Sequence, residues 1–151
     1  MTLRLEMVQP TDAADLLAWR NDPMVRALSR HHGEISWAEH CQWLEHMRGD
    51  PECLFLVGWR DDRRVGVVRF NRRRETDVWE VSITIAPAAQ GQGLGRLVLK
   101  AGIDALHQEH PGAKVLAAVQ MGNHASEKLF LGAGFAPVPS DEDCAHFLLG
   151  A

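Results

Sequence analysis

The spacing of hydrophobic residues along this chain changes from the period of a strand to that of a helix, and these changes predict its elements. Leu3, Leu5 and Met7 alternate with polar residues, as in a half-buried strand. Further strand-like runs follow at residues 54–59, 65–70, 78–85, 115–119 and 144–149. The charged residues 61–64, between the first two of these runs, predict a hairpin turn.

Helices are predicted between the strands from their caps and their apolar spacing. Thr11 is expected to cap a first helix that ends near Arg20, since Pro23 forces the residue before it out of the helical conformation. Ser36 and Glu39 form a capping box at the start of a second helix. Later helices are expected at residues 94–107 and 123–132. Because strands come first and strand–helix units follow, the predicted fold class is a mixed α/β (α+β) sheet in a single domain, residues 1–151.

Composition and charge restrict the classes of function. The 151 residues carry a formal net charge of -4 at pH 7, so binding to nucleic acid is not expected. No apolar run reaches the roughly 20 residues that span a bilayer, and the N-terminus lacks signal-peptide character. We therefore expect no membrane association and a cytoplasmic location. The three cysteines, Cys41, Cys53 and Cys144, predict neither a disulfide framework nor a zinc site.

Two local clusters stand out from this composition. The eight histidines include no pair with the spacing of a familiar metal-ligand motif, so no metal is expected. Arg72-Arg73-Arg74 lies between two apolar runs and predicts a solvated hairpin loop. A contact between this arginine run and a phosphate or an acidic acceptor is the alternative.

The most informative segment is the strand at residues 78–85 followed by Gln90-Gly91-Gln92-Gly93-Leu94-Gly95-Arg96. A strand that runs through glycines into a helix directs backbone N–H groups and the positive end of the helix dipole toward one point, which suits a phosphate. The spacing excludes two common phosphate motifs. Counted from Gly91, the third glycine of a dinucleotide fingerprint is replaced by Arg96, and the Gly-Lys-Ser/Thr of a P-loop is absent.

The pattern that does stand, Gln90-x-x-Gly93-x-Gly95, resembles the pyrophosphate-binding signature of the GNAT N-acetyltransferases. A second match follows in order, because Asn123-His124-Ala125-Ser126, Leu129-Phe130 and Gly134-Phe135 are similar to that family's later motif. The resemblance covers about residues 54–135. It implies a GNAT-like central sheet, mixed but mostly antiparallel and flanked by helices, in which two splayed strands hold acetyl-CoA. From the residues alone, Asn123 and Gly134 would begin and end a helix, and the two interpretations are compatible.

The resemblance also implies which residues contact the coenzyme. Its pantetheine arm would pair with the main chain near Ile83 and Ile85, and its pyrophosphate would lie on the amides of residues 91–96. The residues expected to bind acetyl-CoA are Ile83, Ile85, Gln90, Gly91, Gln92, Gly93, Leu94, Gly95, Arg96, Asn123, Ser126 and Phe130.

GNAT enzymes generally work by direct attack of the acceptor amine on the thioester, which implies a base for the amine. The candidate catalytic residue is Glu80, at the start of the central strand, and a structural carboxylate paired with a nearby arginine is the alternative. Many members use a tyrosine to protonate the leaving thiolate, but this chain has no tyrosine and carries Phe130 at the matching position. Ser126, His40 or water are candidate donors, or the thiolate leaves unprotonated.

The N-terminal third is expected to select the acceptor. Trp19-Arg20-Asn21-Asp22-Pro23 and Ile35-Ser36-Trp37 resemble a GNAT branch that acetylates ribosomal-protein N-termini, polyamines and amino sugars. With residues 65–70, the pattern most resembles the amino-sugar acetyltransferases of pseudaminic-acid biosynthesis. This implies a small-molecule acceptor, the 4-amino group of a UDP-linked amino-deoxy sugar. A monomer or a homodimer is expected, and the sequence leaves the choice between them open. The candidate acceptor-binding residues are Arg20, Asn21, Arg30, His40 and Arg69. The alternatives are a peptide N-terminus or a polyamine as acceptor, and a non-catalytic acyl-CoA-binding sensor.

Overall fold

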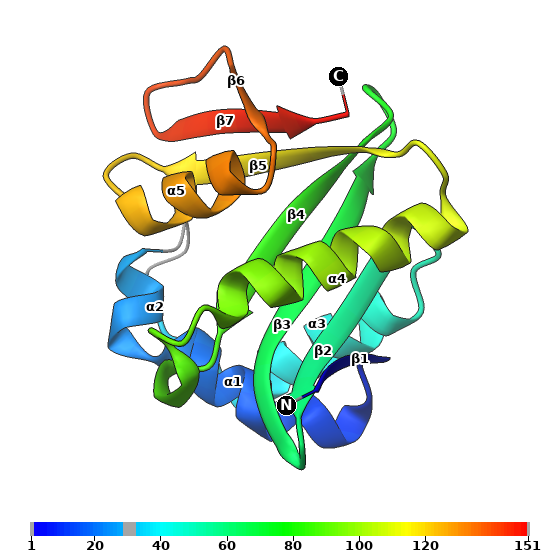
Figure 1. Ribbon diagram of the computed structural model, residues 1–151. Helices are drawn as coiled ribbons and strands as arrows, with labels where there is room; N and C mark the ends of the chain where they lie inside the picture. Colours follow the sequence, from blue (N-terminus) through cyan, green and yellow to red (C-terminus); the bar gives the residue numbers. More distant parts are fainter. Residues whose placement is uncertain (1, 29–32, 151) are drawn as a thin grey trace.

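The computed structural model describes residues 2–28 and 33–150, and a seven-stranded sheet with helices on both faces forms its centre (Figure 1). The strand order is β1-β2-β3-β4-β5-β7-β6. The strands are β1 (Leu3–Met7), β2 (Cys53–Arg60), β3 (Arg63–Arg73), β4 (Val78–Ile85), β5 (Lys114–Gln120), β6 (Ala136–Val138) and β7 (Cys144–Leu149). Neighbouring strands are antiparallel except β4 and β5, which are parallel. The predicted mixed, mostly antiparallel sheet is therefore confirmed.

The helices divide between the two faces of the sheet. In Figure 1, α4 crosses in front of β2, β3 and β4, and α1 and α3 lie behind them. The helices are α1 (Ala13–Asn21), α2 (Pro23–Ala27), α3 (Trp37–Arg48), α4 (Leu94–Glu109) and α5 (His124–Gly132), with short 3-10 turns η1 (Pro10–Asp12) and η2 (Pro87–Ala89). α5 packs beside β5. The arrangement leaves α1–α3 and α4 on opposite sides of β4.

Strand alternation fills a separate core on each face. Along β2, Leu54 and Leu56 belong to the core under α4, whereas Phe55 and Val57 belong to the core under α1 and α3. Both sets of side chains are buried. The central strands are therefore apolar on both faces, and this explains why their sequences read as continuous hydrophobic runs.

β4 and β5 pair over only part of their length. The parallel register runs from Val78↔Lys114 to Val81↔Ala117 and ends there. The rest of β4, residues 82–85, keeps its antiparallel partner β3 but has no partner in β5. The predicted splaying of these two strands is thus confirmed, and it leaves one backbone edge of β4 facing an opening.

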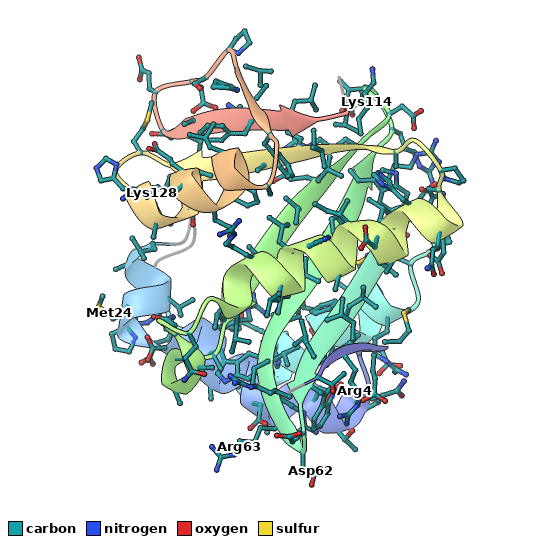
Figure 2. The ribbon with its side chains drawn as sticks, viewed as in Figure 1. Arg4, Met24, Asp62, Arg63, Lys114 and Lys128 are labelled. Atoms are coloured by element: carbon teal, nitrogen blue, oxygen red, sulfur yellow. The ribbon has the colours of Figure 1, made fainter. Side chains whose placement is uncertain are left out.

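The hairpin turn between β2 and β3 is also confirmed. β2 ends at Arg60 and β3 begins at Arg63, with Arg60↔Arg63 as the closing pair. Asp61 takes a positive φ of 57° at this turn. Asp62 and Arg63 project from the end of the molecule (Figure 2).

One local prediction is wrong. Thr11 does not cap α1 but lies in η1, and the buried Asp12 occupies the cap position. There the Asp12 carboxylate accepts a hydrogen bond from the Gln9 N–H (2.7 Å) and forms an ion pair with Arg64 (2.7 Å). The Arg72–Arg74 run is exposed at the hairpin between β3 and β4, as predicted, although β3 continues to Arg73 and only Arg74 lies in the turn. Its arginines pair with carboxylates, which are Glu52 and Asp77 for Arg72, Glu80 for Arg73 and Glu52 for Arg74.

The close approach of α4 to β3 requires a glycine at position 102. A Cβ at Gly102 would lie 2.8 Å from Val68 Cγ1 and 3.2 Å from Phe70 Cε2, both in the buried core. Gly102→Ala should lower the free energy of unfolding by about 1–2 kcal/mol, since overpacking costs more than the helix propensity of alanine returns. Gly132→Ala in α5, where a Cβ meets nothing within 4 Å, is the control. Urea denaturation measures both, and equal stability of the two variants would contradict this packing.

Candidate active site

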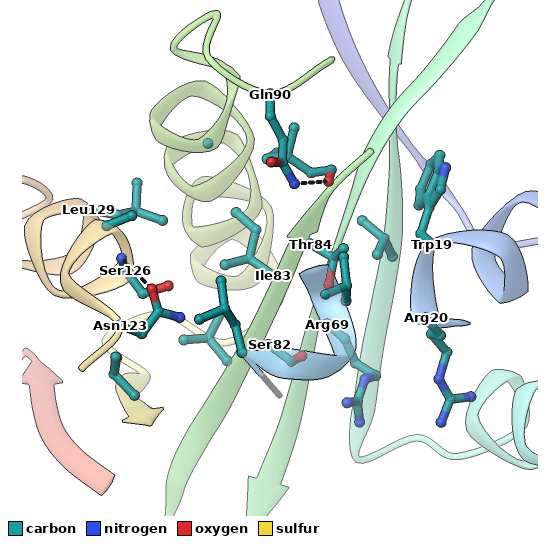
Figure 3. Close-up of a pocket in the computed structure, with 18 of the residues that line it drawn as sticks. Trp19, Arg20, Arg69, Ser82, Ile83, Thr84, Gln90, Asn123, Ser126 and Leu129 are labelled. Atoms are coloured by element: carbon teal, nitrogen blue, oxygen red, sulfur yellow. Dashed lines mark hydrogen bonds between the residues drawn. The ribbon is translucent and has the colours of Figure 1, made fainter. Parts of the chain in front are cut away.

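The gap between β4 and β5 opens into a cleft of about 730 Å³. Its walls come from the second half of β4, the glycine turn after β4, the start of α5, and the α1–α3 side of the sheet. Figure 3 shows Ile83, Gln90 and Leu129 toward one side of β4, and Trp19, Arg20 and Arg69 toward the other. The cleft therefore has two halves that meet along β4.

The glycine turn forms the first half. Gly91 and Gly93 have φ values of 78° and 74°, which side chains with a Cβ rarely adopt, and Gly93 is the N-cap of α4. A Cβ at either position would point into open space. The turn is tied to β4 by the Gln90 side chain, whose Nε2 donates to the Ile85 carbonyl (3.3 Å). The backbone amides at the start of α4 therefore face an accessible space that suits a phosphate group.

Most side chains expected to contact the coenzyme line this cleft. They are Ile83, Ile85, Gln90, Gly91, Gly93, Leu94, Gly95, Asn123, Ser126 and Phe130. Gln92 and Arg96 do not line it. The Gln92 Oε1 instead accepts a hydrogen bond from Arg60 (2.9 Å), and Arg96 is exposed on α4.

α5 presents its N-terminus to the same half of the cleft. The Asn123 Oδ1 accepts a hydrogen bond from the Ser126 N–H (3.3 Å) and so caps the helix, and Gly134 takes a φ of 96° just after its end. The predictions that Asn123 begins this helix and that Gly134 ends it are thus confirmed. Phe130 is buried against Phe135, with ring centroids 5.1 Å apart, so it offers only an apolar wall.

Glu80 lies on the face of β4 that is turned toward α1 and α3. Trp79 and Val81 belong to the core under α4, so strand alternation turns Glu80, Ser82 and Thr84 toward the α1–α3 side. Glu80 lines the cleft with its side chain 25% exposed, and it forms an ion pair with Arg73. The pairing with a nearby arginine is therefore present, and it leaves the carboxylate accessible from the cleft.

Arg20 and Arg69 reach the second half of the cleft from α1 and β3. The guanidinium carbons lie 4.2 Å and 5.1 Å from the centre of the Trp43 ring. Burial lowers the pKa of both arginines, and the charge of Arg69 lowers the pKa of Arg20 further. Trp43 is not among the site residues predicted from the sequence, although its spacing of three from His40 places both on one face of α3.

His40 and Asn21 do not face the cleft. His40 is fully buried at 0% exposure, so it neither contacts an acceptor nor protonates a thiolate in this arrangement. Arginine only donates, so His40 Nδ1 accepts from Arg20 (3.0 Å) and His40 Nε2 donates to the Ala13 carbonyl (3.0 Å). Asn21 bonds the Ile35 backbone through both Oδ1 (2.8 Å) and Nδ2 (2.9 Å). Both residues thus position their neighbours.

The remaining predictions concern absent or undescribed groups. Arg30 lies outside the described residues. Within residues 2–28 and 33–150, no three His, Cys, Asp or Glu side chains gather in a way that would hold a metal ion. Over the same residues, every helix is too short or too polar to cross a membrane.

Comparison with known proteins shows the family of this chain. The model of the acetyltransferase (GNAT) domain matches residues 2–136. The chain belongs to the GNAT acetyltransferase family. The mycothiol acetyltransferase of Nocardia farcinica is 32% identical over 139 residues, which are 87% of this chain. This chain spans only 44% of that relative's length.

Solved GNAT structures share the whole fold. The spermidine N-acetyltransferase from Vibrio cholerae, in complex with CoA and spermine, superposes with a TM-score of 0.88 at 18% identity over 97% of this chain and 94% of its own. An aminoglycoside acetyltransferase in complex with coenzyme A gives a TM-score of 0.80 at 19% identity over 98% and 94%. At such identities the likeness concerns the fold, and the acceptor must be argued from this chain's own residues.

The glycine turn of this GNAT domain gives the first test of the site. Gly93→Ala forces a Cβ onto a φ of 74°, which costs about 1–2 kcal/mol and shifts the amides that face the cleft. The Michaelis constant for acetyl-CoA should rise about 10-fold. Gly112→Ala is the matched control, since Gly112 has a φ of 77° and equally open space but lies in the turn before β5, outside the cleft. Equal Michaelis constants in the two variants would remove the turn from coenzyme binding.

The buried His40 gives a second test, through the dependence of stability on pH. Burial and the charge of Arg20 lower the pKa of His40 and outweigh the hydrogen bond to Ala13, which raises it. The unfolded state, with a pKa of about 6.5, then binds protons first as the pH falls. The stabilisation is thus complete above about pH 6.5 and is lost as the pH falls toward the lowered folded pKa. Urea denaturation between pH 7 and pH 5 should show a smaller loss for His40→Gln than for wild type, and parallel curves would contradict this assignment.

Proposed function

We propose that this chain transfers the acetyl group of acetyl-CoA to a primary amine of a small molecule. The observation that carries the proposal is the parting of β4 and β5 beside the glycine turn, because it joins a phosphate-binding end to a free strand edge. Pantetheine amides would pair with that edge near Ile83 and Ile85, as an added strand does. The thioester would then lie where the two halves of the cleft meet.

The chemistry proposed is direct attack of the amine on the thioester carbonyl. An alkylamine with a pKa of about 10 is neutral to only about one part in a thousand at pH 7, so a base accelerates the reaction. Glu80 would accept the amine proton, directly or through a water held by Ser82 and Thr84, which share its strand face. Collapse of the tetrahedral intermediate breaks the C–S bond and releases coenzyme A as thiolate or thiol. A backbone amide near Ile85 would stabilise the oxyanion.

We further propose a nucleotide-linked amino sugar as the acceptor, with the 4-amino group of a UDP-linked amino-deoxy sugar as the reacting amine. The support is the sequence resemblance of residues 19–23 and 65–70, together with two arginines and the Trp19 and Trp43 rings along the acceptor half of the cleft. A polyamine would bring its own positive charges toward Arg20 and Arg69. The structural similarity to a spermidine acetyltransferase and the sequence similarity to a mycothiol acetyltransferase make polyamines and other amines the acceptors to compare with the amino sugar.

The proposal is tested by measuring thiol release from acetyl-CoA with a UDP-linked 4-amino sugar, spermidine and an N-terminal peptide at matched concentrations. Release should depend on an amine and should have its highest specificity constant with the amino sugar. A higher specificity constant for spermidine or the peptide would contradict the proposed acceptor but not the acetyltransferase activity. Binding of acetyl-CoA with no thiol release for any amine would favour a sensor.

The role of Glu80 is tested separately from its ion pair. Glu80→Gln removes the basic group and should lower turnover about 100-fold near neutral pH, with a smaller deficit at high pH where the amine deprotonates unaided. Arg73→Gln breaks the same ion pair but keeps the carboxylate, and it should change turnover by less than about 10-fold. Equal losses in the two variants would show that the carboxylate acts only through its bond to Arg73.

A further inference from the structure

We infer that Arg20, Arg69 and Trp43 form a subsite for an oxyanion, a carboxylate or phosphate group carried by the acceptor. The inference rests on the proposed function, since it specifies which amines that cleft accepts. It does not depend on the acceptor being a nucleotide sugar. Both anion types fit the planar donor fork of arginine, so the shared chemistry is the prediction.

The first observation is that these two arginines hydrogen-bond only to neutral groups, although the nearby charge of Glu80 acts on Arg69 and raises its pKa against the larger lowering by burial. Arg20 donates to the neutral His40 ring (3.0 Å), and the Arg69 Nη1 donates to Asn71 Oδ1 (2.6 Å). Among the described residues, neither guanidinium forms an ion pair with a carboxylate. Both lie over the same Trp43 ring and both line the cleft. Two like charges are therefore held together in a half-buried place.

The second observation is that the chain builds the same arrangement elsewhere and neutralises it. Arg4 and Arg64 lie 5.2 Å and 4.5 Å from the centre of the Trp59 ring. There Arg4 pairs with Glu6, and Arg64 pairs with Asp12 and Asp15. Stacking on tryptophan thus does not by itself require unpaired arginines. The cluster at Trp43 differs from the cluster at Trp59 because no carboxylate of the described residues forms an ion pair with its arginines, the nearby Glu80 being paired with Arg73, and because it faces a cleft.

Electrostatics explains why this difference points to a ligand. A buried charge without a partner is costly, and repulsion between Arg20 and Arg69 adds to that cost, as the lowered pKa of Arg20 records. An anion placed between them would relieve both effects at once. The cluster is held rigidly, because the buried His40 fixes Arg20 and Asn71 fixes Arg69. Preorganised donors lose little conformational freedom when a ligand arrives.

The subsite also lies beside the proposed reaction centre. Arg69 is directly opposite Ser82 across the β3–β4 ladder, and Asn71 is opposite Glu80. All four side chains share one face of the sheet by strand alternation. An acceptor whose anion binds Arg20 and Arg69 would therefore present a nearby amine to Glu80. The inference excludes polyamines as preferred acceptors, because they carry no anion.

The binding test uses inorganic phosphate and acetate as probes. The measurement is the NMR signal of each tryptophan indole N–H. The chain has five tryptophans, and the signal of Trp43 is assigned with Trp43→Phe. Saturating coenzyme A first occupies the glycine turn, so that phosphate cannot report on it. Titration with at least one probe should then move the Trp43 signal and leave the Trp59 signal in place. Repeating the titration without coenzyme A keeps the Trp43 result independent of the proposed function.

Variants connect the signal to the arginines. Arg20→Gln and Arg69→Gln should each weaken probe binding about 10- to 100-fold, the value of one charge-assisted hydrogen bond. Arg20→Lys and Arg69→Lys keep the charge and should lose less. Arg4→Gln, which alters the stack on Trp59, is the matched control and should leave probe binding unchanged. A Trp43 signal that neither probe moves, or that moves equally in the glutamine variants, overturns the subsite.

The kinetic test compares amines that differ only by an anion. Glucosamine is paired with glucosamine 6-phosphate, and butylamine with 4-aminobutyrate, with thiol release as the measurement. At least one anionic member should have a specificity constant about 10-fold or more above its neutral partner, and Arg69→Gln should remove that advantage. The pair that shows it identifies phosphate or carboxylate as the anion. Equal or higher specificity constants for the neutral amines would overturn the subsite but agree with acetyltransferase activity. No thiol release with any amine would contradict the proposed function, and the tryptophan titration would then decide whether the subsite exists.

Discussion

The parting of β4 from β5 is the constraint on which the rest of the site depends. After Val81↔Ala117, the two parallel strands diverge, and the backbone groups on one edge of β4 lose their partner strand. The Ile85 carbonyl accepts a hydrogen bond from the Gln90 side chain, and the other groups require water or an extended ligand as a partner. The same divergence separates α4 from α5, so that both helix N-termini border the opening. The cleft, its polar edge and its two positive helix ends thus have one structural origin.

The side chains on the two faces of β4 have different surroundings. Alternation places Trp79 and Val81 in the core under α4, and it places Glu80 on the face toward α1 and α3. The glycine turn and α5 border one half, the proposed place of the phosphate-bearing thioester. The arginines on Trp43 border the other half, the proposed place of an anionic amine. In the proposed reaction, one strand would position both reactants for direct attack.

Features encoded by neighbouring residues could be predicted from the sequence. The strand β4, the glycine turn and the capping of α5 by Asn123 all follow from local patterns, and the structure has them in place. The failures come from contacts between distant segments. Asp12, and not Thr11, occupies the N-cap position of α1, and its carboxylate pairs with Arg64, far along the chain. His40 is buried because α3 packs against α1, and no local signal distinguishes a buried histidine from one that faces a ligand.

The central claim is that acetyl-CoA lies in the gap between β4 and β5. A crystal structure of the chain with coenzyme A tests it most directly. The claim predicts the pyrophosphate on the amides of residues 91–96, the pantetheine arm along β4 near Ile83 and Ile85, and the sulfur beside the junction of the two halves of the cleft. Coenzyme bound at another surface, or β4 and β5 closed on each other with the coenzyme excluded, would contradict it.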